Sequence, residues 1–379
     1  MLHLLGERTL GPVSDRIEPG PSAAGRVELT AAELAGIVGS DRAEGLSPIN
    51  GTALAIIDLR EPPTSGGPVP GGLVIGSLPC VVVARTSARS NRWQRAFAGR
   101  CDAVLVEPGP SAAEGAFGVF ADDAQADELF AAVLANPLAA ASLALLLRSQ
   151  AKRSIEEGLV AESTTYSLLQ SGPEFQRWRA SRPRRPTRPQ AEPSVRMARD
   201  GDVLHLTISR PYVHNAFDRS VRDGLTEGLQ LALADPSIER VVLDGDGPSF
   251  SSGGDLDEFG SFADPVSSHL TRLTRSPARL VARLSAPRNR IEVRLHGACM
   301  GAGIELPAFA ASISADPATR LALPELRYGL IPGAGGTVSV TRRIGHHRSA
   351  YLGLSGRTID AETALRWGLI DRIAAREDG

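Results

Sequence analysis

A stretch of interleaved arginine and proline divides this 379-residue chain into two halves. Between residues 177 and 189, six arginines alternate with three prolines. Proline blocks helix formation and like charges repel, so residues 181–195 are predicted to form an extended, solvated linker. A nucleic-acid-binding arm is the alternative interpretation, but Trp178 is the one aromatic residue that accompanies the charges.

The half before the linker contains short apolar runs and then a long helical pattern. The runs Leu54–Leu59, Leu78–Ala84 and Ala103–Val106 are typical of strands that are buried on both faces of a sheet. We therefore predict a smaller α/β domain at residues 1–126 and a helical segment at 127–180. No arrangement of residues in this half points to a catalytic site.

The half after the linker alternates strands with helices. Strands are predicted at Val203–Ser209, Val241–Asp244 and Glu292–Leu295, and a helix at Arg219–Ala234. Such βα units imply a mainly parallel sheet and the α/β fold class for the domain at 196–379.

Three glycine-rich segments follow strands in this second half. They are Phe250–Leu256 (FSSGGDL), His296–Leu306 (HGACMGAGIEL) and Leu330–Thr337 (LIPGAGGT). Glycine lets a ligand approach the backbone closely, and a helix that begins at such a turn directs free N–H groups toward it. Two turns of this kind that meet at one point would form a two-donor oxyanion hole, although each alone can be an ordinary tight connection.

Two glutamates lie beside these segments. Glu305 is in the first turn of the helix that follows the second segment, and Glu325 precedes the third. Either carboxylate could simply complement a helix dipole or cap a turn, so the spacing alone leaves their role open.

Five segments, in this order, resemble those of the enoyl-CoA hydratase (crotonase) superfamily over about residues 195–375. They read RPYVHNAF, FSSGGDL, HGACMGAGIEL, LPELRYGLIPGAGGT and GRTIDAETALRWGLID. The resemblance implies a crotonase-like (ClpP/crotonase) core of ββα units in the C-terminal half. It also implies that the protein is an acyl-CoA enzyme.

The resemblance assigns roles to four residues. The backbone N–H groups of Ser252 and Ala302 would form the oxyanion hole, with alanine at a position where the family commonly has glycine. Glu305 would activate water and Glu325 would protonate C2 of the acyl group. Two carboxyl groups with opposite protonation demands suit the addition of water.

The same resemblance suggests which residues contact the substrate. We expect substrate contacts from Ser251, Gly254, Asp255, Leu256, Phe259, Gly301, Pro332 and Gly333. Phe259 can equally be core packing, and Leu330 and Ile331 are expected along the acyl chain. We expect no metal and no separate cofactor, because the coenzyme A is part of the substrate. Lys152 is the single lysine, so phosphates would be bound by arginine and backbone donors.

The helical segment before the linker also resembles this superfamily. Residues 129–178 are similar to the helices that follow the GLID-type segment in its members, whereas this chain ends eight residues after Asp371. We predict a degenerate tandem, in which an inactive front copy supplies the closing helices and the back copy supplies the chemistry. The alternative is an unrelated α/β accessory domain with a helical hairpin.

Composition limits the partners. A formal net charge of −2 gives no overall attraction to nucleic acid or to anionic lipid. The apolar stretch Pro137–Leu147 is too short to span a bilayer and is predicted to be a buried helix. Three cysteines without a C-x-x-C pair favour a reduced, cytoplasmic protein, and we expect a homo-oligomer, a trimer or a multiple of one.

Other titratable residues are interpreted as structural. His346 and His347 follow Gly345 and are predicted to lie in a surface loop rather than to act in catalysis. Cys299 is predicted to be a small buried hydrophobe, because no base is nearby.

The leading prediction is a lyase that hydrates a 2-enoyl-CoA or catalyses the reverse dehydration. A double-bond isomerase that uses Glu325 alone is the second enzyme hypothesis. A catalytically silent subunit that supports another crotonase chain is the non-enzyme hypothesis.

Overall fold

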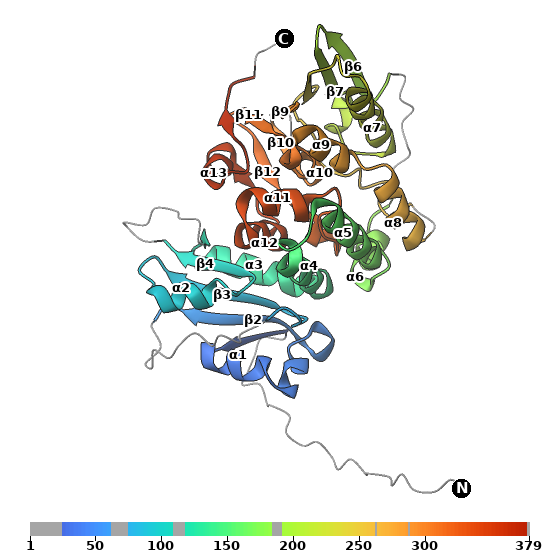
Figure 1. Cartoon of the computed structure of the whole chain (residues 1–379). Coiled ribbons are helices and arrows are strands. Elements are labelled where there is room, and N and C mark those ends of the chain that lie inside the picture. The colour runs from blue at the N-terminus through green and yellow to red at the C-terminus, as the bar shows by residue number, and fades with distance from the viewer. Residues whose placement is uncertain are drawn as a thin grey trace, which may run out of the picture.

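The computed structural model of the chain describes residues 25–61, 75–108, 118–183, 192–261, 264–286 and 289–376. These residues form two lobes, each built around β-sheet, with helices between the sheets (Figure 1). The predicted α/β class is confirmed. Most of the predicted linker lies outside the described residues.

Five parallel strands form the N-terminal sheet in the order β1-β2-β3-β4-β5. They are β1 (Gly25–Leu29), β2 (Thr52–Leu59), β3 (Val81–Ser87), β4 (Ala103–Glu107) and β5 (Val119–Phe120). The strand expected at 78–84 begins later, because residues 75–80 form turns and bends. Strands therefore neighbour one another in the order of the chain, as short, uncrossed connections favour.

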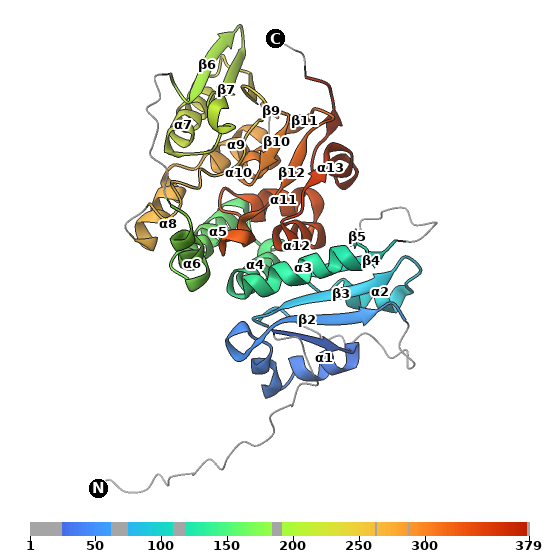
Figure 2. The ribbon, with the colours of Figure 1, turned by 180° about the vertical axis from the view of Figure 1, so that it is seen from behind.

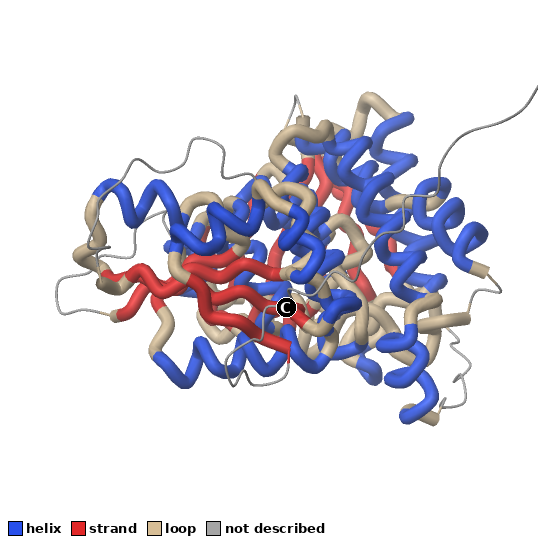
Figure 3. Tube along the Cα trace, turned by 90° about the horizontal axis from the view of Figure 1, so that it is seen from below, coloured by secondary structure: helices blue, strands red, loops and turns tan. Residues whose placement is uncertain are grey.

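Helices cover both faces of this sheet (Figure 3). Alternate side chains of a strand point to opposite faces: Leu54 and Ile56 pack with α3 (Asp123–Ala135) and α4 (Pro137–Gln150), on the side of the C-terminal lobe. Ala55 and Ile57 pack with the outer helices, α1 (Ala31–Val38) and α2 (Arg92–Ala98). Two short 3₁₀ helices, Asp41–Gly45 and Pro48–Asn50, lead from α1 into β2.

Helices α3 and α4 meet at an angle of 106°. The break lies at Pro137, which cannot continue the preceding helix and instead begins the next. Leu143 and Leu147 of α4 are buried, which confirms the predicted buried helix. Among the described residues, no single helix is long and apolar enough to cross a membrane, whereas α3 and α4 taken together reach that length and composition.

The C-terminal lobe contains two sheets. The six-stranded sheet has the order β14-β11-β9-β8-β7-β6 and is parallel except for the β6–β7 hairpin. Its strands are β6 (Val195–Asp200), β7 (Val203–Ile208), β8 (Arg240–Gly245), β9 (Ile291–Leu295), β11 (Ser312–Ala315) and β14 (Arg372–Ile373). The smaller sheet consists of β10 (Ala298–Met300), β12 (Arg320–Ala322) and β13 (Ile359–Asp360).

Helices surround these sheets (Figure 2). They are α7 (Arg219–Ala234), α8 (Pro265–Thr274), α9 (Pro277–Ser285), α10 (Ala302–Glu305), α11 (Gly336–Ile344), α12 (His346–Ser355) and α13 (Ala361–Trp367). Three 3₁₀ helices complete the lobe: η3 (Pro211–Val213), η4 (Pro307–Phe309) and η5 (Glu325–Tyr328).

The helices before the linker pack on the C-terminal lobe. After α4, the chain forms α5 (Ile155–Gln170) and α6 (Pro173–Ser181). Helix α5 contacts α8, and α4 contacts α11 and α12. One hydrophobic cluster extends from the inner face of the N-terminal sheet through these helices to the C-terminal sheets. The helical segment is thus shared by both lobes, as the closing-helix prediction requires; whether the front half is a second copy stays a prediction.

A buried ion pair joins the N-terminal sheet to α4. The Arg148 guanidinium donates from Nε and Nη2 to the two carboxylate oxygens of Asp102, each at 2.7 Å, and the two side chains are 7% and 0% exposed. Its remaining N–H groups donate to the carbonyls of Ile75, Leu78 and Cys80. Asp102 also accepts a hydrogen bond from the Val82 amide at 2.8 Å.

The surface-loop prediction for His346 and His347 is wrong. Both residues begin α12 at this same junction, where α12 packs on β4. His347 Nδ1 lies 3.3 Å from the Asp102 carbonyl oxygen, and His346 Nε2 lies 4.0 Å from its carboxylate. Burial lowers the pKa of both imidazoles, so they serve as half-buried packing groups between the lobes.

Candidate active site

A cavity in the C-terminal lobe brings Glu305 and Glu325 together. Glu305 is the last residue of α10, which begins directly after β10, and Glu325 is the first residue of η5, directly after Pro324. Both carboxyl groups are buried and interact through a side-chain hydrogen bond. The two glutamates that lie 20 residues apart in the sequence thus form one acidic pair.

Alternate backbone amides of the loop before α11 bind two buried carboxylates. The amides of Ala334 and Gly336 donate to Glu305 Oε2 at 2.7 and 2.9 Å. The amides of Gly335 and Thr337 donate to Glu162 at 2.6 and 2.8 Å. Successive N–H groups at a helix N-terminus have no acceptor within the helix, and here two carboxylates satisfy them.

Burial raises the pKa of Glu305 and of Glu325, and neighbouring negative charge adds to the effect. The Glu305 carboxylate is favoured by its two amide donors, whereas Glu325 Oε2 is buried without a donor among the described residues. The hydrogen bond between the two carboxyls acts the other way, since it raises the pKa of Glu305 and lowers that of Glu325, and the Glu325 backbone amide lowers the pKa of Glu325 as well. The two groups therefore titrate as one coupled pair that can share a proton.

Glycine is required at position 301, between β10 and the pair. Its φ of 49° is in the region that favours glycine, and its amide donates to the Ala322 carbonyl at 2.9 Å. A Cβ atom there would lie 2.3 Å from Glu325 Oε1. Gly301 thus turns the chain into α10 and leaves room for the carboxyl group.

The prediction that Ser252 supplies an oxyanion-hole donor is wrong. Its amide already donates to the His214 carbonyl at 2.8 Å. Two residues later, the Gly254 amide has no acceptor among the described residues, and neither has that of Ala302 at the start of α10. Both Gly254 and Ala302 line the cavity with the two glutamates, so this pair of amides, rather than Ser252 and Ala302, can bind an oxygen.

The cavity wall includes half of the predicted substrate contacts. Gly254, Asp255, Phe259 and Gly333 line it. The wall does not include Ser251, Leu256, Gly301 and Pro332, nor Leu330 and Ile331. Ser251 is instead a buried turn residue, whose hydroxyl donates to the Asn215 carbonyl at 2.8 Å, while Leu330 and Ile331 are fully buried core side chains.

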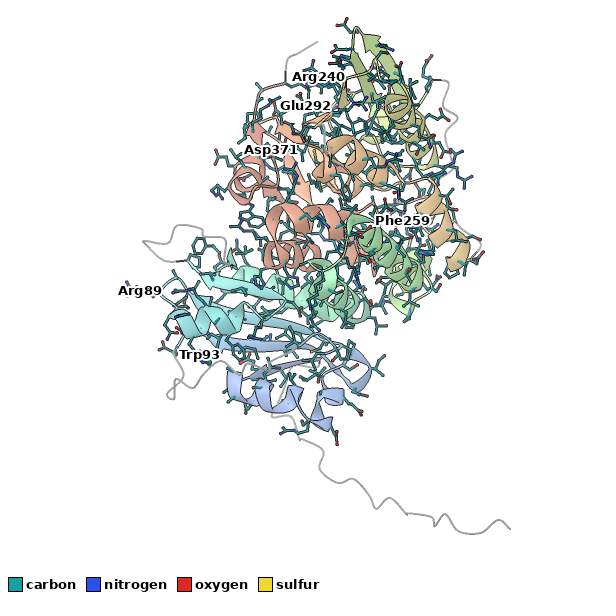
Figure 4. The ribbon with its side chains drawn as sticks, in the orientation of Figure 1. Arg89, Trp93, Arg240, Phe259, Glu292 and Asp371 are labelled. Carbon is teal, nitrogen blue, oxygen red and sulfur yellow. The ribbon has the colours of Figure 1, made fainter. Side chains whose placement is uncertain are left out.

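Phe259 belongs both to the cavity wall and to an aromatic cluster. Its ring centroid lies 6.1 Å from that of Trp178 and 6.2 Å from that of Tyr328. A Cβ atom on Gly254 would meet the Phe259 ring at 2.6 Å, so the ring packs directly on the segment that carries a free amide. Figure 4 labels Phe259 in the region where Figure 1 labels α5, α6 and α8.

Helix α5 contributes two residues that contact the loop before α11 and that the sequence did not predict. Besides its backbone bonds, Glu162 accepts a hydrogen bond from the Thr337 hydroxyl at 2.6 Å, and burial raises its pKa to about 8. Tyr166 is buried against Gly333, where an added Cβ atom would lie 2.4 Å from the ring. The sequence did contain a signal for a buried acidic group. The charged Glu162 lies on the same face of the predicted helix as Leu159 and Tyr166.

Comparison with known proteins gives consistent matches to the C-terminal half. The family model described as enoyl-CoA hydratase/isomerase matches residues 198–378. A 2,3-dehydroadipyl-CoA hydratase of Escherichia coli (strain K12) is 32% identical over 177 residues, which cover 47% of this chain and 68% of that protein.

A trans-2-decenoyl-[acyl-carrier-protein] isomerase of Streptococcus mutans serotype c (strain ATCC 700610 / UA159) is 30% identical over 182 residues, with 47% of this chain and 68% of that protein covered. Among solved structures, an enoyl-CoA hydratase from Thermoplasma volcanium GSS1 matches with 29% identity and a TM-score of 0.44 and covers 49% of this chain and 73% of that chain.

Proposed function

Because this chain belongs to the enoyl-CoA hydratase/isomerase family, we propose that it adds water across the double bond of a 2-enoyl-CoA or removes water in the reverse direction. The observation that carries this proposal is the pair of buried carboxyls, Glu305 and Glu325, which share one cavity with two free amides. The pair can supply a base and an acid at the same time.

The amides of Gly254 and Ala302 bind the thioester oxygen. Water attack at C3 moves an electron pair toward that oxygen, and two preorganised donors in a dry cavity stabilise the resulting charge. Removal of one such donor typically slows a reaction by ~10²–10³. Ser252 takes no part in this step, because its amide is already bonded.

Glu305 acts as the base and Glu325 as the acid. The two backbone donors to Glu305 favour its carboxylate, which takes the proton from water as the oxygen bonds to C3. Glu325, which has an oxygen without a donor, holds the proton that is delivered to C2. The hydrogen bond between the two carboxyls then returns a proton from Glu305 to Glu325, which restores the starting state.

A screen of 2-enoyl-CoA thioesters, with 3-hydroxyacyl products measured by mass spectrometry, tests this proposal. Glu305→Gln and Glu325→Gln should each lower kcat by ~10²–10⁴, the usual contribution of a positioned acid or base. Glu292→Gln is a matched control, because Glu292 pairs with Arg372 at the end of the lobe away from Phe259 (Figure 4).

The products separate the alternatives. Shifted double bonds without 3-hydroxyacyl products, and a rate that depends on Glu325 alone, would identify an isomerase instead. If no thioester reacted and the chain bound another crotonase subunit, it would be a silent partner.

We also propose how this enzyme assembles and where it is located. The coenzyme A arrives and leaves with the acyl group, and the chain assembles with further copies of itself. A cytoplasmic location is supported by three free, buried cysteines.

A further inference from the structure

Four arginines line the cavity that holds the two glutamates or a second cavity that shares Gly333 with it: Arg219, Arg222, Arg272 and Arg275. Arg222 and Arg275 both form ion pairs with Asp223, at 2.9 and 3.0 Å. Arg219, at the start of α7, is exposed to solvent. Arg272 of α8 lines both cavities, as Arg222 does, but its contacts differ from those of the other three.

Arg272 is a partly buried cation whose contacts are all neutral. Its guanidinium carbon lies 4.4 Å from the centre of the Tyr166 ring. Its Nε donates to the Ser163 hydroxyl at 3.3 Å and its Nη2 to the Ser167 hydroxyl. Within the described part of the chain, no carboxylate forms an ion pair with it. The Glu162 carboxyl raises the pKa of Arg272 through its charge, but its hydrogen bonds go to Gly335 and Thr337.

Such a cation is costly to bury without a counter-charge. Burial lowers the pKa of Arg272, although Glu162 and Tyr166 act in the opposite direction. The Nη1 donors of Arg272 have no acceptor among the residues that the structure describes. An anionic group that enters the cavity would supply both the missing charge and the missing acceptors.

The position of Arg272 indicates which part of the substrate it can reach. Its partner Tyr166 packs on Gly333, and the next amide, that of Ala334, holds the Glu305 carboxylate. Arg272 also lines a second cavity with Leu159, Leu273 and Leu306, whose side chains are apolar. An apolar wall suits an acyl chain rather than a coenzyme phosphate, so the end of the acyl chain is the part of the substrate that we place beside Arg272.

We propose that this enzyme takes enoyl-CoA substrates whose acyl chain carries a terminal carboxylate, and that the Arg272 guanidinium binds that carboxylate. The proposal rests on the function proposed above and specifies its substrate class. Arg272 is on α8, which packs against α5, so Ser163, Tyr166 and Ser167 hold the guanidinium in place for its ligand. An acyl chain that ends in a methyl group leaves the cation without a partner.

The test compares binding of two saturated thioesters, so that it does not depend on turnover. One is a six-carbon acyl-CoA that ends in a carboxylate and the other is hexanoyl-CoA, both measured by calorimetry on the full chain. A hydrogen bond to a charged group contributes enough for about a 10- to 100-fold preference for the carboxylate. Arg272→Gln, which can still bond the two serines, should abolish this preference, while Arg272→Lys should keep part of it.

Arg275→Gln is the matched control, because Arg275 lies at the same cavity but is paired with Asp223; it should leave the preference unchanged. Equal binding of both thioesters by the unaltered chain overturns the proposal, whether or not the variants fold. Equal weakening of both thioesters and of free coenzyme A by Arg272→Gln also overturns it, since Arg272 would then bind a coenzyme phosphate. Selective binding without any hydration would uphold the Arg272 assignment and refute the hydratase proposal, so the two failures are distinguishable.

Discussion

Replacement of Arg148 by methionine should destabilise the whole molecule strongly. The change removes two charge-assisted bonds of 2.7 Å to Asp102 and three bonds to backbone carbonyls. Asp102, which is fully buried, would keep the Val82 amide as its main donor. Loss of one partner of a buried ion pair typically costs about 3–5 kcal/mol, because the remaining charge is left uncompensated.

Urea unfolding measures this cost, with circular dichroism for both lobes and fluorescence of the three tryptophans, Trp93, Trp178 and Trp367. We expect the free energy of unfolding of Arg148→Met to fall by about 3–5 kcal/mol. Asp102→Asn removes the charge but keeps the shape, and the double variant should be less destabilised than the sum of the single changes. A loss below about 1 kcal/mol, typical of an exposed pair, would refute the reasoning.

Two further predictions concern the glutamate pair. Gly301→Ala places Cβ 2.3 Å from Glu325 Oε1. It should lower kcat/KM for hydration by at least ~10², because a shift of about 1 Å in a reacting group can have that effect. The control is Gly201→Ala, which has φ 58° but no neighbour within 4 Å; it reports the backbone strain alone and should leave the rate unchanged. The pH profile of kcat/KM should be bell-shaped: activity rises as Glu305 loses its proton and falls as Glu325 loses its own, and burial moves both limbs above the ordinary glutamate range. Glu325→Gln should remove the alkaline limb, and an acid limb at the ordinary glutamate pKa would contradict the burial argument.

Local sequence motifs predicted the elements of the C-terminal site well. The two glutamates each stand beside a glycine-rich turn, and short connections carry those turns to one cavity. The oxyanion donor was misplaced by two residues, because a turn sequence does not tell which of its amides is already bonded; only the His214 carbonyl, which accepts from Ser252, decides it.

Long-range contacts account for the other errors. Glu162 and Tyr166 reach the site from α5, across the linker, and nothing near them in the sequence names their partners. His346 and His347 follow a glycine and read as a loop, but the N-terminal sheet covers them. In each of these cases, the decisive neighbour is a packing surface that only the folded chain creates.

The position of α5 before the catalytic residues has a consequence for biosynthesis. A ribosome extends the chain from the N-terminus at roughly 5–20 residues per second, so Glu162 is made about 9–35 s before the amides of Gly335 and Thr337 that will bind it. In the folded chain, the N-terminal sheet covers the apolar side of α3 and α4, and all of these residues precede the second lobe in the sequence. The helices that contact the second lobe are therefore synthesised before that lobe, and it can pack against them as soon as it leaves the ribosome.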